Sequence, residues 1–151
     1  MILFILILPR RFPSIVTMTI LFLALGIVQF TDYLLGAPPI DLYDANDRPE
    51  AEFIDIIHYY SYSLYGYIFL YIFDKWKLRG LYITLYVIGW SLFGTAFEYV
   101  ADYFHVYTYK GWNLRYSFLY YLFIQSLYLL FYYLIKNKYA QTKLPNGRKW
   151  N

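Results

Sequence analysis

Four long apolar runs, separated by short charged segments, constrain this chain more than any other feature of its sequence. Each run is long enough to cross the hydrocarbon core of a bilayer. A backbone in hydrocarbon must satisfy its own hydrogen bonds, and these runs are too long and too uniformly apolar for barrel strands. The sequence therefore predicts an all-α fold: a polytopic membrane protein with four transmembrane helices in an antiparallel bundle. The helices are expected at about 14–35, 55–73, 81–104 and 114–135.

The composition fits one integral membrane domain over 1–151. Hydrophobic residues make up 60% of the chain and charged residues only 15%, which is too apolar for a soluble domain. We expect an acidic outer loop at 36–54 and a basic tail at 136–151. Cysteine is absent, which excludes disulfides, thiol nucleophiles and thiolate metal sites.

The basic residues predict the orientation of the bundle. Most of them lie in the N-terminal segment, the second connection and the C-terminal tail, which must share one side of the membrane. Positively charged loops stay in the cytoplasm, so both termini are predicted to be cytoplasmic (N-in/C-in). The basic face suits anionic lipid headgroups, and nothing indicates nucleic acid binding. The cytoplasmic set is Arg10, Arg11, Lys75, Lys77, Arg79, Lys136, Lys138, Lys143, Arg148 and Lys149; the outer set is Arg48, Lys110 and Arg115.

A polar stripe on the third run is the strongest candidate for chemistry. Glu98, Asp102 and His105 are spaced i, i+4 and i+7, which puts them on one face of a helix. On the second run Asp55 and His58 also face together at the outer end. These five residues are candidate ligands for zinc, manganese or iron, and the first three are candidate catalytic residues. The alternative is that acids and histidines at outer helix ends simply reach headgroups and water.

Glu98 is the hardest of these residues to place at a surface. It lies about 9 Å of helical rise inside Phe104, where an unpaired carboxylate costs about 2 to 3 kcal/mol or more. We expect it to face the bundle interior and to bond with a tyrosine hydroxyl or with Arg115. Gly94, one turn earlier, would let a neighbouring helix approach closely. Asp32 of the first run, in contrast, lies near the outer end, at a depth similar to that of Asp55 and His58.

Other polar residues inside the runs indicate helix packing. Many of the twenty-one tyrosines lie too deep for interfacial belts, and we expect them to hydrogen-bond between helices. Gln125 and Ser126, in the middle of the fourth run, are expected to do the same.

The segment Gly111-Trp112-Asn113 indicates a structural turn before the fourth run. Gly111 is expected to supply an unusual backbone angle, Trp112 to anchor at the outer interface, and Asn113 to cap the following helix. Either the motif only fixes the hairpin between the third and fourth helices, or it brings Trp112 and Asn113 over Glu98 to close an outward-facing pocket.

The segment 107–117, YTYKGWNLRYS, follows a helix that contains Phe97-Glu98-Tyr99. This order resembles a group of small uncharacterised integral membrane proteins of Bacillus-type spore-forming bacteria, and the segments 43–49 and 71–76 are similar to that group as well. The resemblance implies a location in the membrane and no particular activity. The matching residues are Glu98, Tyr107 or Tyr109, Gly111, Trp112, Asn113 and Ser117.

The sequence contains no nucleophile motif, phosphate loop or HExxH. The leading hypothesis is a non-enzymatic, multi-pass protein of a bacterial cytoplasmic membrane, which has no cofactor and acts through a membrane protein partner or as a homo-oligomer. One alternative is an intramembrane metal-dependent or lipid-modifying enzyme that uses the five polar residues above. Another is a transporter or channel subunit.

Overall fold

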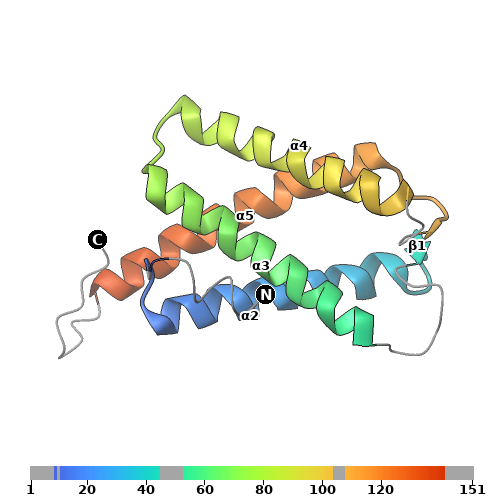
Figure 1. The fold of residues 1–151 in the computed structure, drawn as a ribbon, viewed down its shortest axis with the longest axis horizontal. Coiled ribbons are helices and arrows are strands. Elements are labelled where there is room, and N and C mark those ends of the chain that lie inside the picture. Colours follow the sequence, from blue (N-terminus) through green and yellow to red (C-terminus); the bar gives the residue numbers. More distant parts are fainter. Residues whose placement is uncertain (1–8, 10, 45–52, 104–107, 142–151) are drawn as a thin grey trace.

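The computed structural model of the chain describes residues 9, 11–44, 53–103 and 108–141, and most of this part is helical (Figure 1). The coarse prediction of an all-α fold with four helices is therefore confirmed for the described residues. The structure also contains a π-helical turn and one pair of very short strands, which were not predicted. The α-helices are α2 (Ser14–Thr31), α3 (Phe53–Trp76), α4 (Leu81–Tyr103) and α5 (Leu114–Gln141). The other elements are the π-turn η1 (Asp32–Gly36) and the strands β1 (Tyr43–Asp44) and β2 (Thr108–Tyr109).

The helix ends differ most from the apolar boundaries in two places, and α3 exceeds its expected bounds by two or three residues at each end. The first run becomes a π-turn at Asp32 rather than continuing as α-helix. The last helix runs beyond Ile135 to Gln141, into the segment expected to be tail. Lys136 and Lys138 follow the apolar run, yet they lie near the helix C-terminus, where the helix dipole favours positive charge. The end of an apolar run therefore does not mark the end of this helix.

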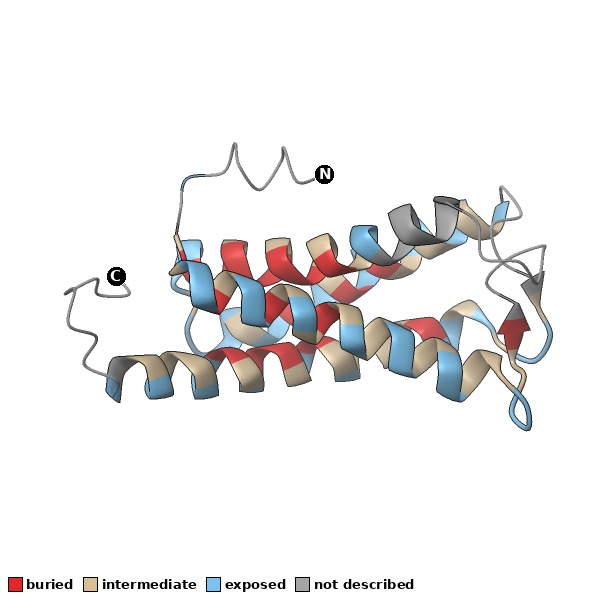
Figure 2. Cartoon of the chain, turned by 90° about the horizontal axis from the view of Figure 1, so that it is seen from below, coloured by how far each residue is buried: buried red, intermediate tan, exposed pale blue. Residues whose placement is uncertain are grey.

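The chain runs back and forth along the bundle, with α2 packed on α3, α4 packed on α5, and α3 in contact with α5 (Figure 1). Phe69 and Leu70 of α3 are fully buried between the helices, and Figure 2 shows the buried residues facing inward. Gly66 allows a close approach at this point. A Cβ atom there would lie 3.2 Å from the Cβ of Ala24 and 3.1 Å from the ring of Tyr128. Three helices therefore meet at Gly66.

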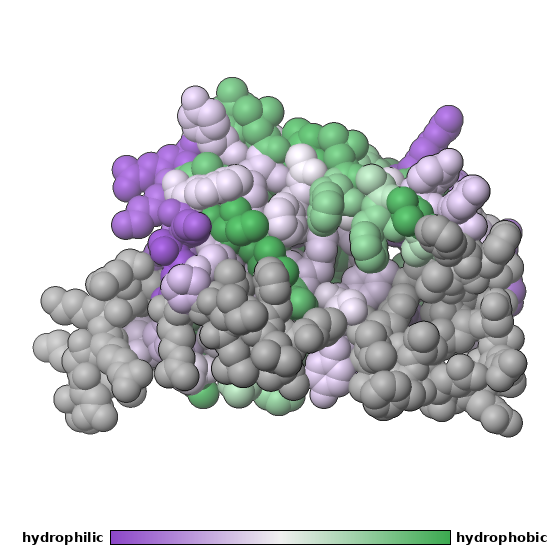
Figure 3. All heavy atoms as spheres, in the orientation of Figure 1, coloured by the Kyte–Doolittle hydropathy of each residue, from purple (hydrophilic) through white to green (hydrophobic). Residues whose placement is uncertain are grey.

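Three of the described helices are long and apolar enough to cross a membrane: 14–36, 81–103 and 114–139. They turn large apolar side chains outward, among them Phe22, Leu85 and Phe123. Figure 3 shows apolar side chains over the middle of one face and hydrophilic ones toward its ends. Water does not favour such a surface, whereas lipid does. These helices identify a membrane protein.

The segments that follow α2 and α4 lie at the same end of the bundle, which we call the acidic end because Asp32 and Glu98 lie there. Backbone hydrogen bonds join these two segments. Tyr43 of β1 pairs with Tyr109 of β2 in an antiparallel register. Next to this pair, the carbonyl oxygen of Leu42 accepts hydrogen bonds from three successive amides, those of residues 110, 111 and 112, at 3.0, 3.0 and 3.1 Å. Because β1 follows α2 and β2 follows α4, the pair connects the α2–α3 half of the bundle to the α4–α5 half.

Candidate functional site at the acidic end of the bundle

Glu98, half-buried on α4, lies at the centre of a hydrogen-bond network. Its Oε1 accepts a hydrogen bond from the hydroxyl of Tyr109 at 2.7 Å and another from the hydroxyl of Ser117 at 2.6 Å. The indole N–H of Trp112 in turn donates to Ser117 Oγ at 2.8 Å. Of the two partners expected for Glu98, a tyrosine hydroxyl or Arg115, the tyrosine is confirmed.

The environment of Tyr109 fixes the direction of hydrogen bonding. Burial raises the pKa of Tyr109, and the hydrogen bond and negative charge of Glu98 raise it further. Both effects favour the neutral phenol. Tyr109 therefore keeps its proton and donates a hydrogen bond to Glu98.

A second acid network lies at the end of α2. Asp32, the first residue of η1, accepts a hydrogen bond from the buried hydroxyl of Tyr43 at 2.7 Å. Beside it, the hydroxyls of Thr31 and Tyr120 lie 2.6 Å apart and share a hydrogen bond. The ring of Tyr43 contacts the ring of Trp112 edge-on, with centroids 5.9 Å apart. This contact connects the Asp32 network to the Glu98 network.

Both networks border one cavity of about 80 Å³ between the helices. The carboxylates of Asp32 and Glu98 and the amide of Gln125 supply its polar wall, and tyrosine side chains together with Trp112 supply most of the rest. Among the described residues, no lysine, arginine or histidine lines it. At roughly 30 Å³ per water molecule, the cavity has room for two or three waters or a ligand of that size.

The Gly-Trp-Asn turn combines one confirmed expectation with one that is wrong. Asn113 caps α5, because its Oδ1 accepts hydrogen bonds from the backbone amides of Arg115 at 3.0 Å and Tyr116 at 3.3 Å. Gly111 does not have the unusual backbone angle that we expected, since Gly80 is the glycine with positive φ in the described part of the chain. A Cβ atom at Gly111 would instead lie 3.2 Å from Cδ2 of Leu42. This glycine makes room for the neighbouring loop.

The structure describes the side chains of only some of the five candidate metal ligands. Asp102, one turn beyond Glu98, is half-buried beside Tyr109 and Arg115 and does not line the cavity. Asp55 and His58 belong to α3, but their side chains lie outside the described part, and so does the whole of His105. Within the described residues, no three acids or histidines form a group that could hold a metal ion.

Gln125 forms the polar centre of the bundle, as the sequence predicts. Its side chain is 1% exposed and accepts a hydrogen bond from Ser91 Oγ of α4 at 2.9 Å. Its amide N–H donates to the hydroxyl of Tyr65 of α3 at 3.1 Å, which in turn donates to the carbonyl of Trp90 at 2.8 Å. The same expectation is wrong for Ser126, which is exposed and bonds within its own helix.

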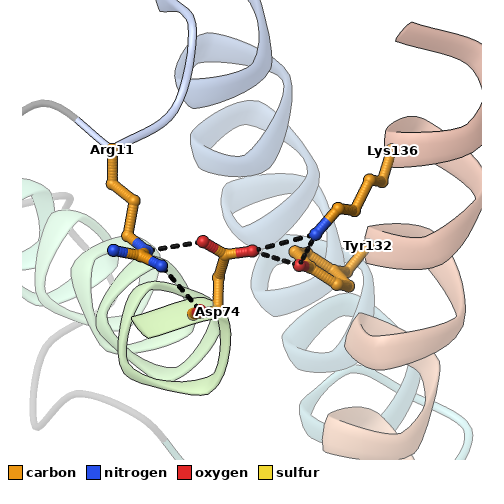
Figure 4. A network of polar contacts seen from close by, with 4 residues as sticks. All are labelled: Arg11, Asp74, Tyr132 and Lys136. Carbon is orange, nitrogen blue, oxygen red and sulfur yellow. Dashed lines mark hydrogen bonds and ion pairs between the residues drawn. The ribbon is translucent and has the colours of Figure 1, made fainter. Parts of the chain in front are cut away.

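At the opposite end of the bundle, Asp74 is buried within a cluster of ion pairs and hydrogen bonds (Figure 4). Arg11 Nε lies 2.5 Å from one carboxylate oxygen, and Lys136 Nζ lies 3.2 Å from the other. The hydroxyl of Tyr132 also donates to Asp74. Burial alone would raise the pKa of Asp74, but the hydrogen bonds from Tyr132, Lys136 and Arg11 outweigh it and hold the pKa below its ordinary value. The carboxylate is therefore a fixed anion that joins the N-terminal segment, α3 and α5.

The sequence identifies Glu98 and Trp112 and predicts a tyrosine partner for Glu98 without naming Tyr109, but it does not predict the bonds of Ser117 and Tyr43. Ser117 belongs to the segment that carries the family resemblance, and Asp32 is the acid expected at the outer end of the first run. These two features are the only signals of the networks in the sequence.

Comparisons with protein-family models, with curated proteins and with solved structures find no match for the chain.

Proposed function

We propose that the chain is a non-enzymatic, four-span protein of a bacterial cytoplasmic membrane that acts through a membrane protein partner or a second copy of itself. The fourth span is α3, which is less apolar than the other three. Its 24 residues give about 36 Å of helix, enough to cross a bilayer. It also runs from the end of the bundle where α2 finishes to the end where α4 begins (Figure 1).

The lower hydropathy of α3 is compatible with this path through the membrane. The buried side chains of Tyr67, Phe69 and Tyr71 face other helices rather than lipid. The hydroxyl of Tyr65 is bonded within the bundle. A polar group that is bonded inside the protein costs far less at this depth than one that faces hydrocarbon.

The proposed orientation places the Asp74 end in the cytoplasm. Exposed Lys75, Lys77 and Arg79 surround this end, as the positive-inside rule requires for a cytoplasmic face. The resemblance to small membrane proteins of spore-forming bacteria points to the envelope of such an organism.

One observation carries the proposal of a non-enzymatic role: the described charged and amide side chains inside the bundle have their hydrogen-bond and ion-pair partners among other side chains of the bundle. Glu98 accepts from Tyr109 and Ser117, Asp74 from Arg11 and Lys136, and Gln125 bonds to two further helices. Such bonds fix helix positions. The large apolar faces of α2, α4 and α5 then remain for lipid and for protein contacts.

The orientation can be tested without a background signal because the chain contains no cysteine. Single cysteines would replace Arg79, exposed between α3 and α4, and Lys110, exposed between β2 and α5. In intact cells, a membrane-impermeant maleimide should label Lys110→Cys, and it should label Arg79→Cys only after permeabilisation. Labelling of Arg79→Cys but not of Lys110→Cys in intact cells would contradict this orientation, and labelling of both would contradict a membrane crossing by α4.

The partner can be tested with a photo-crosslinking residue placed along the exposed face of α4, at Leu85, Leu92 and Tyr99. Irradiation of native membranes should give an adduct of discrete higher mass at some of these positions. Mass spectrometry of the adduct would distinguish a second copy from another protein. If every position on this face, and matched positions Phe22 and Phe123 on α2 and α5, gave only monomer with lipid attached, the proposal would be wrong.

A further inference from the structure

The turn between α3 and α4 carries three positive charges that the described structure does not neutralise. Lys75, Lys77 and Arg79 are exposed, and in the described part of the chain none of their side chains forms a hydrogen bond or an ion pair. The one acid in the 56–97 segment of the sequence is Asp74, which already pairs with two other basic residues (Figure 4). Figure 3 shows hydrophilic side chains at the end of the molecule where α3 meets α4. The turn therefore presents an unbalanced positive surface.

The backbone at Lys77 adopts a conformation that glycine adopts more easily than lysine. Lys77 follows the last residue of α3 and has a φ of 50°, which lies in the left-handed region. Its amide donates to the carbonyl of Phe73 at 3.2 Å and ends the helix, a role that glycine usually has. A residue with a Cβ atom costs free energy in this conformation. Because lysine is less favourable than glycine for the fold here, its presence indicates a use for its charge outside the fold.

The apolar neighbours of the three cations place the turn at the level of lipid headgroups. Only the four residues 77–80 separate α3 from α4, and Leu78 among them packs against the core, so the turn stays close to the helix ends. The adjoining side chains of Trp76, Leu81 and Tyr82 are 61, 72 and 69% exposed. Exposed aromatic rings beside lysine and arginine are typical of a membrane interface, where the rings contact acyl chains and the cations reach phosphates. This combination fits a lipid better than it fits a soluble acidic protein.

We propose that the turn between α3 and α4 binds the phosphate group of an anionic phospholipid, with Lys75, Lys77 and Arg79 as its cationic partners. Trp76 lies at the boundary between the headgroup and the acyl chains of that lipid. Each basic residue near an anionic bilayer surface contributes about a fivefold preference for it. The inference rests on the proposed function in one respect: α3 and α4 must both cross the membrane, so that the turn lies at its surface. It requires no protein partner.

Lipid retention by the full chain provides the test. The protein is placed in nanodiscs of equimolar phosphatidylglycerol and phosphatidylcholine with the same acyl chains, and native mass spectrometry counts the lipids that stay bound when the disc is disrupted. The wild type should retain phosphatidylglycerol in excess of the ratio supplied. Lys75→Gln should lower this enrichment by about two- to fivefold. Lys110→Gln, which removes an exposed cation at the acidic end, is the matched control and should retain phosphatidylglycerol as the wild type does.

Lys77→Gly separates lipid binding from a structural role, because the two predict opposite results. Glycine removes the charge and relieves the backbone, so this variant should lose enrichment by a similar factor, whereas its unfolding temperature in discs of phosphatidylcholine alone should be unchanged or raised. The proposal is overturned if the wild type retains the two lipids in the ratio supplied or if Lys75→Gln and Lys77→Gly retain phosphatidylglycerol as the wild type does. It is also overturned if Lys110→Gln lowers the enrichment equally, since the lipid would then respond to net charge alone.

The maleimide labelling described above reports the membrane crossing separately. Labelling that confirms the crossing, together with no enrichment of phosphatidylglycerol, would overturn the lipid inference and leave the proposed function intact. Labelling that contradicts the crossing would overturn both.

Discussion

A Cβ atom on Gly94 of α4 would lie 2.7 Å from the hydroxyl oxygen of Tyr65 on α3. That hydroxyl donates to the carbonyl of Trp90 and accepts from the amide of Gln125. The Tyr65 hydroxyl is therefore held by two hydrogen bonds, and moving it would weaken them. The absence of a side chain at Gly94 sets how closely α3 and α4 approach.

Replacement of this glycine should loosen the bundle. We expect Gly94→Ala to lower the free energy of unfolding by about 1 to 3 kcal/mol, because the methyl group displaces the Tyr65 hydroxyl. Gly89→Ala is the matched control on the same helix, since a Cβ there would meet nothing within 4 Å. It should leave stability unchanged or raise it by about 0.5 to 1 kcal/mol. Unfolding in mixed micelles measures both, and equal effects of the two substitutions would contradict the close contact.

Asp74 should contribute strongly to stability because it is buried and shared by three partners. Asp74→Asn should lower the free energy of unfolding by about 1 to 3 kcal/mol, since Arg11 and Lys136 lose their common anion. Asp41→Asn is the control. It removes an acid from the exposed pair with Lys110, in which both side chains are 42% exposed, and should have a much smaller effect. A loss no larger than that of the control would show that the cluster is a surface feature.

The contribution of Asp74 should also depend on pH in a defined direction. Its pKa in the folded protein lies below the ordinary value of 3.8, so the stabilisation is complete above that value and is lost as the pH falls through the folded pKa. The stability difference between wild type and Asp74→Asn should therefore be constant from neutral pH to about pH 5 and shrink below about pH 4. Thermal unfolding across this range measures it. A difference that grows on acidification would mean that the pKa is raised.

The hydrogen bond between Ser91 and Gln125 should appear as a coupling energy between α4 and α5. A double-mutant cycle with Ser91→Ala and Gln125→Leu should give about 0.5 to 1.5 kcal/mol. The same cycle with Ser126→Ala in place of Ser91→Ala should be additive within about 0.5 kcal/mol, because Ser126 bonds only to Leu122 of its own helix in the described structure. Equal coupling in both cycles would exclude a specific bond.

Metal content tests the alternative of an intramembrane metalloenzyme. We expect detergent-purified protein to contain no stoichiometric zinc, manganese or iron by plasma mass spectrometry, because Glu98 is already engaged by Tyr109 and Ser117. The same measurement on His58→Ala and Glu98→Gln gives the comparison. A metal present in the wild type at near one equivalent and lost in both variants would make the metalloenzyme the leading hypothesis.

The features that could be predicted from the sequence depend on short spacings along the chain. Helix positions follow from apolar length, because the bilayer imposes that length. The cap at Asn113 and the close approach at Gly94 depend on the local sequence and on residue size. Glu98 could be assigned to the interior from its depth alone, since an unpaired carboxylate is costly there.

The features that could not be predicted depend on which segments become neighbours. Asp32 bonds to Tyr43 only because the outer loop folds back, and Asp74 meets Lys136 only because α3 lies beside α5. Neither of these two contacts produces a periodic pattern in the sequence. Gly111 illustrates the same limit: the sequence indicated a special residue, but the reason is the proximity of Leu42 rather than a backbone angle.

The two halves of the bundle are held together differently at its two ends. At the acidic end, β1 and β2 and the carbonyl of Leu42 join the loops by neutral backbone hydrogen bonds, which acid hardly affects, beside the exposed ion pair of Asp41 and Lys110. At the other end, the halves are joined through buried Asp74, whose ion pairs with Lys136 and Arg11 are lost when acid protonates the carboxylate. Acidification should therefore loosen the contact between the helix pairs at the Asp74 end first. The joined loops would then act as the hinge about which the two pairs swing apart.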